Sequence, residues 1–283
     1  MKLFEDRVAA ITGAGSGIGR ALAVNLASRG AHLALSDIDE AGLAETVTMC
    51  EGHGVKVTSQ RLDVADRDAI YTWADQVVAD HERVNFIFNN AGVALAANIA
   101  TMSDEDMHWL IDINLWGVIN GTRAFLPHLE ASGEGHVVNL SSVFGLISVP
   151  SQSAYNVAKF GVRGFTDTLR MELAIAGSPV SATTVHPGGV KTDIARSARV
   201  SGDVASLVGG NEEKARDGFD RIARTTADQA AKDILAAVER DRRRVVVGFD
   251  GKVIDLLSRL PAVVVQGMMV NVAKLGRRFS QRS

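Results

Sequence analysis

Three side chains within residues 142–159 are of types that could act together on one small molecule. Ser142 follows the apolar run 136–140, which predicts a buried strand, so its hydroxyl would stand near a strand end. Tyr155 and Lys159 are four residues apart, which places both on one face of a helix. A hydroxyl, a phenol and an ammonium group that meet at one point would form a site for proton transfer to and from oxygen.

The phenol needs help to act as a base at neutral pH. A free tyrosine has a pKa near ~10, and a fixed cation beside it stabilises the phenolate and lowers that value. A shift of about three units needs roughly 4 kcal/mol, more than one lysine supplies, so a second positive charge would have to contribute. Taken alone, the Tyr155 and Lys159 pair is more simply explained as an amphipathic tyrosine beside a surface lysine. Its meaning therefore depends on the rest of the chain.

Composition narrows the classes of function. The 283 residues suffice for one large α/β domain or two small ones, and 46% apolar with 22% charged residues is ordinary for a globular protein. A net charge of −3 gives no reason to expect nucleic acid or an anionic membrane as a partner. Cys50 is the single cysteine, which excludes an intrachain disulfide and fits a reducing compartment. The amino terminus lacks the apolar core of a signal peptide, so we expect a cytoplasmic protein.

A glycine-rich turn lies between the first predicted strand, residues 7–12, and the first predicted helix, residues 20–29. Its pattern is Thr-Gly-x-x-x-Gly-x-Gly, with Gly13, Gly17 and Gly19 at the glycine positions. Glycines let the backbone approach a pyrophosphate, and a helix N-terminus offers free N–H groups and a positive dipole end. The strict Gly-x-Gly-x-x-Gly register is absent, and a glycine turn without a ligand is the alternative.

Asp37 ends the second predicted strand, residues 31–36, and lies 18 residues past Gly19. A carboxylate there can bind both ribose hydroxyls of an adenosine. It would repel a 2′-phosphate, and no Arg or Lys occupies positions 36, 38 or 39, which favours NAD over NADP. The alternative is that Asp37 only caps the next helix, for which Asp39 is the better candidate.

The remaining chain continues to alternate strands and helices. We predict strands at 54–62, 84–88, 136–140, 180–185 and 243–249, and helices that include 40–52, 66–81, 103–129, the Tyr155 helix to 176 and 227–240. This cadence predicts a doubly wound parallel sheet with right-handed crossovers, an α/β fold. Functional loops of such a sheet lie at the carboxyl ends of its strands, where every motif noted here falls.

The chain resembles the short-chain dehydrogenase/reductase family in its compact single-domain form. The resemblance spans about residues 5–192 and extends toward Gly248. The motifs that carry it are Thr12-Gly13-x-x-x-Gly17-x-Gly19, Asn89-Asn90-Ala91-Gly92, Asn114, Ser142, Tyr155-x-x-x-Lys159 and Pro187-Gly188. The resemblance implies a Rossmann-like sheet of strand order 3-2-1-4-5-6-7, a nicotinamide cofactor and a Tyr-Lys-Ser-Asn tetrad.

The resemblance also implies roles for individual residues. Tyr155 would be the general acid/base, and Lys159 would lower its pKa and bind the nicotinamide ribose. Ser142 would bind the substrate oxygen; Ser141 is the rival, but the thirteen-residue offset to Tyr155 favours Ser142. Asn114 would anchor a water in a proton relay, although an amide on an apolar helical face is also a common core residue.

The implied cofactor site draws on loops after several strands. Asp63 and Val64 would hold the adenine, residues 90–92 its ribose side, and residues 187–192 the nicotinamide end. The whole set comprises Gly13, Ser16, Gly17, Ile18, Gly19, Asp37, Asp63, Val64, Asn90, Ala91, Gly92, Tyr155, Lys159, Pro187, Gly188, Val190 and Thr192, with no metal site.

These expectations combine into a reaction. A secondary alcohol would lose its hydroxyl proton to Tyr155 and its carbon hydride to the nicotinamide, and reduction would reverse both steps. The apolar segments 93–96 and 143–147, without an arginine clamp, favour an apolar or bulky alcohol or ketone. A cofactor-binding regulator and an epimerase or dehydratase relative are the alternatives. The family suggests a homodimer or homotetramer through the Asn114 and Tyr155 helices.

Two segments lie outside the central pattern. We expect residues 1–250 to form one domain, in which the polar segment 193–226 is either a substrate lid or a disordered surface loop. Residues 251–283 would form an extension, amphipathic at 252–260, broken at Pro261 and then apolar with a basic end. The extension could cover the pocket, pack across a subunit interface or lie on a membrane surface, and Gln266, Asn271 and Lys274 favour packing against protein.

Overall fold

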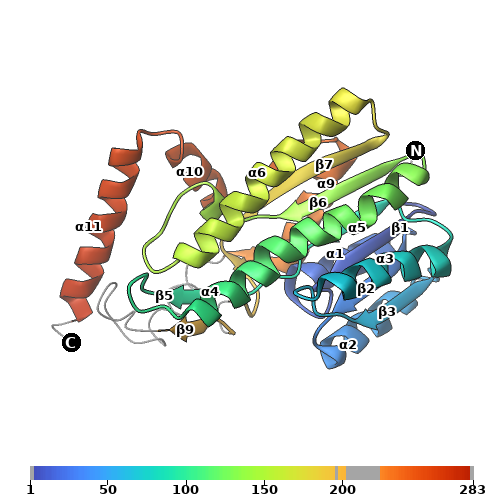
Figure 1. The fold of residues 1–283 in the computed structure, drawn as a ribbon, viewed down its shortest axis with the longest axis horizontal. Coiled ribbons are helices and arrows are strands. Elements are labelled where there is room, and N and C mark those ends of the chain that lie inside the picture. Colours follow the sequence, from blue (N-terminus) through green and yellow to red (C-terminus); the bar gives the residue numbers. More distant parts are fainter. Residues whose placement is uncertain (1–2, 195–196, 202–223, 281–283) are drawn as a thin grey trace.

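The alternating strands and helices assemble into a seven-stranded parallel sheet with helices on both faces (Figure 1). The structure, a computed structural model, describes residues 3–194, 197–201 and 224–280. The strand order is β3-β2-β1-β4-β6-β7-β11, which confirms the predicted order of the seven sheet strands. These strands are β1 (Val8–Thr12), β2 (His32–Asp37), β3 (Val57–Arg61), β4 (Phe86–Asn89), β6 (Gly135–Leu140), β7 (Val180–Pro187) and β11 (Arg244–Val247).

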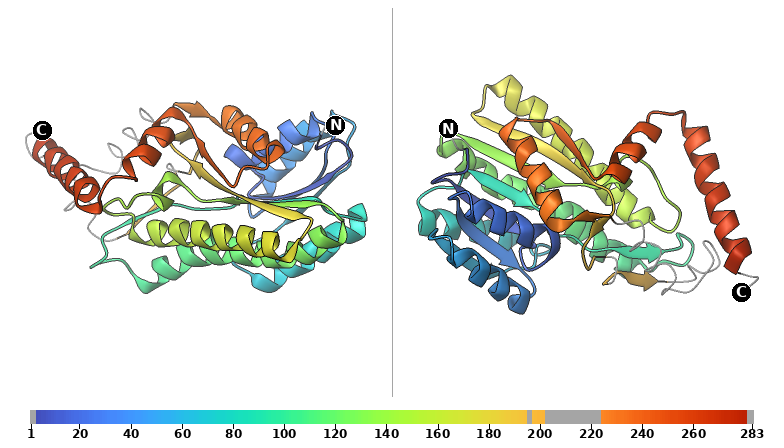
Figure 2. Two further views of the ribbon diagram at one scale, coloured as in Figure 1. Left: turned by 90° about the horizontal axis from the view of Figure 1, so that it is seen from above. Right: turned by 180° about the vertical axis from the view of Figure 1, so that it is seen from behind.

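Helices cover each face of the sheet as two separate layers, which Figure 2 shows from above and from behind. One layer packs an apolar core of α1, α2 and α9 against the sheet, and the other packs a core of α3, α5 and α6. Because both faces are covered, every residue of the central strand β1 is buried. The helices are α1 (Gly17–Ala27), α2 (Glu40–Glu51), α3 (Arg67–His81), α5 (Gly117–Ala131), α6 (Ser153–Ala176) and α9 (Ala227–Glu239).

Several helices begin at capping residues that the sequence indicated. The side chain of Asp39 accepts a hydrogen bond from the N–H of Ala41 at the start of α2, and Asp66 accepts one from Ala69 at the start of α3. Helix α4 (Asp104–Ile111) begins in the same way after Ser103. Each cap satisfies a backbone N–H that has no partner within the helix, which fixes where the helix starts.

The predicted helix 103–129 contains an irregular turn. A π segment, η1 (Asp112–Trp116), separates α4 from α5, and Asn114 lies in it fully buried. Beside it, a third apolar cluster packs α4 and β5 (Leu95–Ala97) against the first turns of α6, where Tyr155 stands. This cluster fixes the position of the helix that carries Tyr155 and Lys159.

Short elements surround the carboxyl end of the sheet. β8 (Val190–Lys191) pairs with β10 (Thr225–Thr226), and β5 pairs with β9 (Arg199–Ser201), pairings that the sequence did not predict because the strands are only two or three residues long. Most of the segment 193–226, expected as a lid or loop, lies outside the described residues.

The carboxyl-terminal extension forms two helices. α10 (Phe249–Leu257) begins three residues before the predicted amphipathic segment, Pro261 separates the helices as expected, and α11 (Ala262–Ser280) projects beyond the end of the sheet (Figure 1). Within the described part of the chain, no helix is long and apolar enough to span a bilayer.

Candidate active site

Ser142 and Tyr155 meet at the carboxyl end of β6. Ser142 leaves the strand in an extended conformation and caps the short 3-10 turn η2 (Val143–Gly145), where its Oγ accepts the N–H of Phe144 at 3.2 Å. The Ser142 side chain lies near enough to the Tyr155 phenol to lower its pKa by side-chain hydrogen bonding. Phe144 packs edge-on against the Tyr155 ring, with 6.1 Å between ring centres, and so restricts the orientation of the phenol.

Lys159 lies one turn further along α6 and is almost completely buried. Its Nζ donates to the carbonyl of Leu140 at 3.0 Å and lies 5.5 Å from the centre of the Tyr155 ring. Ser141, the rival of Ser142, donates its hydroxyl to the carbonyl of Lys159 at 2.7 Å. The structure thus engages Ser141 with the α6 backbone and brings Ser142, Tyr155 and Lys159 together.

Burial moves the pKa values of the two titratable groups apart, that of Tyr155 upward and that of Lys159 downward. Desolvation raises the pKa of the half-buried Tyr155 to about 12, against an opposing effect of the hydrogen bond with Ser142. Desolvation lowers the pKa of Lys159 to about 8. From the sequence, Lys159 was expected to lower the pKa of Tyr155. In the chain alone the net direction is upward, because burial disfavours the phenolate more than the neighbouring groups stabilise it.

Both polar atoms of the Asn114 amide bind the backbone of Val93. Its Oδ1 accepts the N–H of Val93 and its Nδ2 donates to the carbonyl of Val93, both at 2.8 Å. A Cβ at position 92 would lie 3.2 Å from Asn114 Oδ1 and 3.6 Å from Lys159 Nζ, so Gly92 allows these two side chains to approach the 90–93 loop. Asn114 therefore fixes the loop that borders the site.

The glycine turn is held tightly against the neighbouring loop. Gly13 and Gly17 adopt φ values of 66° and 52°, a left-handed conformation that glycine adopts without steric cost. A Cβ at position 19 would lie 2.0 Å from the carbonyl oxygen of Gly13, so no other residue fits there. Asn90 donates its Nδ2 to the carbonyls of Thr12 and Gly13, at 2.9 Å each, and so supports the turn.

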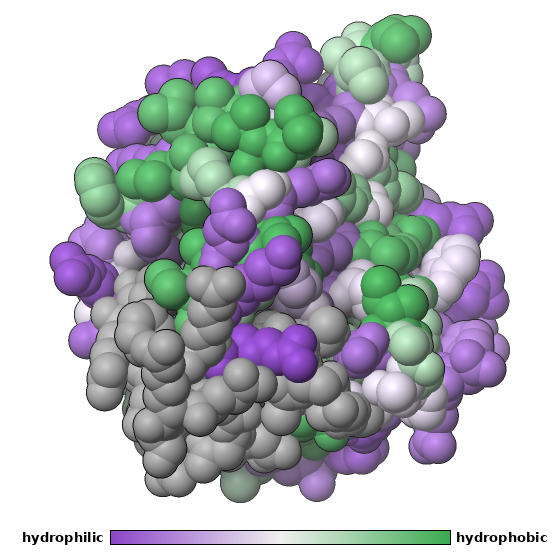
Figure 3. Space-filling view, turned by 90° about the vertical axis from the view of Figure 1, so that its left-hand side faces the viewer, coloured by the Kyte–Doolittle hydropathy of each residue, from purple (hydrophilic) through white to green (hydrophobic). Residues whose placement is uncertain are grey.

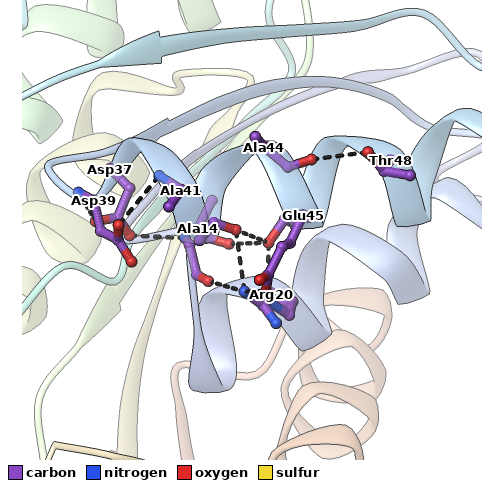
Figure 4. Close-up of polar contacts among 11 residues, drawn as sticks. Ala14, Arg20, Asp37, Asp39, Ala41, Ala44, Glu45 and Thr48 are labelled. Atoms are coloured by element: carbon purple, nitrogen blue, oxygen red, sulfur yellow. Dashed lines mark hydrogen bonds and ion pairs between the residues drawn. The ribbon is translucent and has the colours of Figure 1, made fainter.

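Asp37 stands at the carboxyl end of β2 beside this turn (Figure 4). Its Oδ2 accepts the N–H of Gly15 at 2.7 Å, and its Oδ1 accepts the N–H of Asp39 at 2.9 Å. Arg20 reaches into the same corner, where its guanidinium donates to the carbonyl of Gly15 and pairs with Glu45 at 2.9 Å. Arg20 is thus engaged with Glu45, and the Asp37 carboxylate faces the turn.

The turn and its surroundings fit a dinucleotide. Ser16 begins α1 without a side-chain capping bond, unlike Asp39 and Asp66, so the first N–H groups of the helix are available to a phosphate. Thr192 lies against the turn, since its Cγ2 would be 3.0 Å from a Cβ on Gly17. A hollow of about 730 Å³ beside the turn is lined by residues that include Gly17, Arg20, Lys191 and Thr192.

The other predicted cofactor residues lie at the carboxyl edge of the sheet, where some of them pack against the elements that form this edge. Asp63 accepts the N–H of Ala65 at 2.9 Å, and Val64 packs against Gly117. Ile18 packs on the apolar core, as does the buried Val190 in β8. Pro187 ends β7, and the N–H of Gly188 donates to the carbonyl of Val247 at 3.0 Å. These residues are brought to the carboxyl edge of the sheet, as the sequence predicted from their positions after strands.

Sequence reasoning assigned no role to three contributors, of which Thr12 stood in a motif already quoted. The Thr12 Oγ accepts the N–H groups of Asn90 and Ala91 at 3.0 and 3.1 Å. The Oδ2 of Asp250 accepts the N–H of Gly189 at 2.6 Å, which ties the start of α10 to the 187–192 loop. Thr12 and Asp250 each follow or end a strand at the carboxyl edge of the sheet, and that position was the available signal.

His186 is the third. It is fully buried, and its Nδ1–H donates to the carbonyl of Ser142 at 2.8 Å, which leaves Nε2 without a partner among the described residues. Burial lowers the pKa of His186 to about 4, so the imidazole is neutral at pH 7. It supports the backbone of Ser142 from the adjacent strand.

A doubly wound parallel sheet, a glycine turn before α1 and a Ser-Tyr-Lys cluster define a nucleotide-dependent oxidoreductase architecture. A family model described as short chain dehydrogenase matches residues 7–201. The chain belongs to the short-chain dehydrogenase family.

Individual relatives agree with this assignment. Putative oxidoreductase SadH of Mycobacterium tuberculosis is 51% identical over 261 residues, which cover 92% of each chain. The crystal structure of a short chain dehydrogenase/reductase from Burkholderia phymatum in complex with NAD has a TM-score of 0.82 and 32% identity, and covers 94% of this chain and 96% of its own. An alcohol dehydrogenase from Thermococcus sibiricus complexed with 5-hydroxy-NADP has a TM-score of 0.71 and 25% identity, over 84% of this chain and 94% of its own.

Proposed function

We propose that this oxidoreductase interconverts a secondary alcohol and a ketone, with Tyr155 as the general acid/base. The observation that carries the proposal is the convergence of the Ser142 hydroxyl, the Tyr155 phenol and the buried Lys159 ammonium at the end of β6. A hydroxyl and a phenol that lie beside each other can both contact one substrate oxygen.

A bound nicotinamide would supply or accept the hydride. The residues that would hold it are the glycine turn, the free N-terminus of α1, Asp37 at the ribose and the 187–192 loop. In reduction, Tyr155 gives its proton to the carbonyl oxygen, and its raised pKa keeps that proton in place at neutral pH. Ser142 holds the oxygen, and Lys159 carries the positive charge that stabilises the phenolate left behind.

In oxidation the same residues act in reverse. The alcohol O–H passes its proton to Tyr155 as the C–H hydride leaves, so a carbonyl forms while one proton and one hydride are removed. Tyr155 must first lose its proton, which its burial opposes. The positive charges of Lys159 and of an oxidised nicotinamide would both lower the pKa of Tyr155.

We infer that the substrate is apolar or bulky. Val143 and Leu146 are buried next to the site, and Phe144 packs on Tyr155, so these walls carry no charge to bind a carboxylate or phosphate. An initial-rate comparison of cyclic and long-chain ketones with keto acids of similar size tests this. Faster turnover of the keto acids would overturn the inference.

We further propose NAD as the preferred cofactor, because the Asp37 carboxylate faces the turn and the nearby Arg20 is paired with Glu45.

We propose a homodimer or homotetramer through the helices of Asn114 and Tyr155, on which Trp116, Val157 and Phe160 are exposed. A cofactor-binding regulator of the same fold, or an epimerase or dehydratase, is the alternative function.

The decisive experiment compares wild type with Tyr155→Phe. Wild type should oxidise members of a secondary-alcohol panel with NAD, followed as absorbance of the reduced nicotinamide. Tyr155→Phe removes only the phenolic oxygen, so kcat should fall by about three orders of magnitude or more while the Kd for NAD changes by less than threefold. Binding of NAD without turnover of any alcohol or ketone by wild type would support the regulator instead.

A further inference from the structure

The carboxyl-terminal arm, residues 249–280, exposes an unusual share of the apolar surface. Of the twenty large apolar side chains exposed in the described part of the chain, ten lie between Phe249 and Leu275. Figure 3 views the end of the molecule that carries α11, and apolar side chains gather there into broad patches. Exposed apolar surface concentrated in this way marks a contact with another molecule.

Helix α11 has one side against the protein and an adjacent side without cover. Val265, Met269 and Ala273, spaced four residues apart, are buried or half-buried. Val264, Met268, Val272 and Leu275 follow an adjacent stripe of the helix and are 39–68% exposed. The arm therefore presents a continuous apolar stripe that the described residues of its own chain leave exposed.

The arm and the rest of the chain carry net charges of opposite sign. Five of the 30 Lys and Arg residues, and none of the 33 Asp and Glu, lie after Asp255. The first 255 residues therefore carry 25 basic and 33 acidic residues, a net charge of −8. Lys274 and Arg277 are exposed near the end of α11. The arm is basic where the body of the same protein is acidic.

We propose that the arm docks on the acidic body of a second copy of this chain through the stripe Val264, Met268, Val272 and Leu275. Charge complementarity favours this partner, because each copy supplies both a basic arm and an acidic surface. An anionic membrane fits less well. Its headgroups would repel the acidic body, and the side of α11 away from the stripe carries Gln266, Gly267 and Val270 where interfacial helices use lysines and arginines.

The first test measures mass in solution by sedimentation velocity. Val264→Asp/Val272→Asp places charge on the stripe and should lower the mass of the wild-type assembly at micromolar concentration to that of the assembly held by the helices of Asn114 and Tyr155 alone. Gln266→Asp/Val270→Asp adds the same charge to the exposed side of α11 away from the stripe and should leave the mass unchanged. Circular dichroism and the melting temperature check that both variants fold. A wild-type mass of one chain, or an unchanged mass in the stripe variant, overturns the proposal.

The electrostatic part has its own readout. Lys274→Glu/Arg277→Glu should raise the dissociation constant of the assembly at least tenfold at low salt. Added salt should reduce the ratio between the dissociation constants of the variant and of wild type. Wild-type binding to vesicles of phosphatidylglycerol, lost in the stripe variant while the mass stays constant, would assign the arm to a membrane and overturn the proposal.

A cross-linking experiment avoids the risk that a charged variant fails to fold. Cys50 is the single cysteine and is buried, so Leu275→Cys creates one accessible thiol. A benzophenone maleimide attached there should give a product of two chains on illumination, with the second attachment mapped to residues 1–255. A label at position 266 is the matched control and should cross-link at least fivefold less. Products within one chain alone would refute docking between copies.

Discussion

The ammonium nitrogen of Lys159 lies 5.5 Å from the centre of the Tyr155 ring, one helical turn away on α6. Lys159 is buried and Tyr155 half-buried, and desolvation moves their pKa values in opposite directions, to about 8 for Lys159 and about 12 for Tyr155. At pH 7 the lysine still carries its charge and the phenol its proton. Tyr155 is therefore in the protonated form that can donate a proton. Keeping the ammonium charge of the buried Lys159 reduces the free energy of unfolding.

That cost gives a prediction for stability. The pKa of Lys159 falls from 10.5 to about 8 on folding, so between these pH values the unfolded chain binds more protons and the free energy of unfolding rises with pH. Below pH 8 the charged lysine costs roughly 3 kcal/mol. Lys159→Met should be about 2 kcal/mol more stable than wild type at pH 7, after losing the hydrogen bond to Leu140, although inactive.

Urea unfolding of both proteins from pH 7 to 10 measures this difference, which should shrink as the pH rises. The raised pKa values of Tyr155 and Cys50 lower the stability only above about pH 9, and they act on both proteins. Wild type equal to or more stable than Lys159→Met at pH 7 would contradict the prediction.

Asp37 gives a prediction for cofactor choice. Its carboxylate accepts the Gly15 N–H at 2.7 Å, where it would repel a 2′-phosphate. Asp37→Asn removes the charge, and the ratio of kcat/KM for NADP over NAD should rise tenfold or more, since two charges about 4 Å apart near a surface interact by several kcal/mol. Asp39→Asn is the matched control: it removes an equal charge two residues away and should leave the ratio within twofold.

The sequence was sufficient where the signal is local or periodic. Alternating strands and helices defined the sheet, the spacing of Tyr155 and Lys159 placed them on one helix face, and Asp66 marked a helix start. It was insufficient where a side chain binds backbone far along the chain. Asp250 bonds an N–H 61 residues away and His186 a carbonyl 44 residues away, and backbone groups leave no mark in the sequence. The spacing of Tyr155 and Lys159 predicts that they share a helix face, but it does not predict how deeply either side chain is buried. The sequence therefore led us to expect a lowered pKa for Tyr155, because the effect of desolvation was not foreseen.

Asp250 gives a prediction for cofactor binding. Its Oδ2 accepts the Gly189 N–H at 2.6 Å and so shapes the loop proposed to hold the nicotinamide end. Hydrogen bonds to charged groups contribute roughly 1.5–3 kcal/mol, so Asp250→Ala should weaken NAD binding by about tenfold in calorimetric titration. Asp250→Asn should fall between the two, and Lys252→Ala, on the same helix, should match wild type. An unchanged Kd in Asp250→Ala would separate this contact from the cofactor site.

His186 gives a prediction for acid stability and for the reaction together. Its pKa falls from 6.5 to about 4 on folding, so the stability it preserves above pH 6.5 is lost as the pH drops through 4. His186→Asn removes this titration and can keep an N–H donor for the Ser142 carbonyl, so it should lose less stability between pH 6.5 and 4 than wild type, by up to roughly 3 kcal/mol.

His186→Val removes the donor as well and leaves the Ser142 carbonyl unpaired, which costs about 1–3 kcal/mol. Because Ser142 is proposed to hold the substrate oxygen, His186→Val should lower kcat about tenfold or more, whereas His186→Asn should stay within threefold of wild type. NAD binding, measured in parallel, should be the same in all three proteins. Equal loss of kcat in both variants would mean that the volume of the imidazole matters here and its N–H does not.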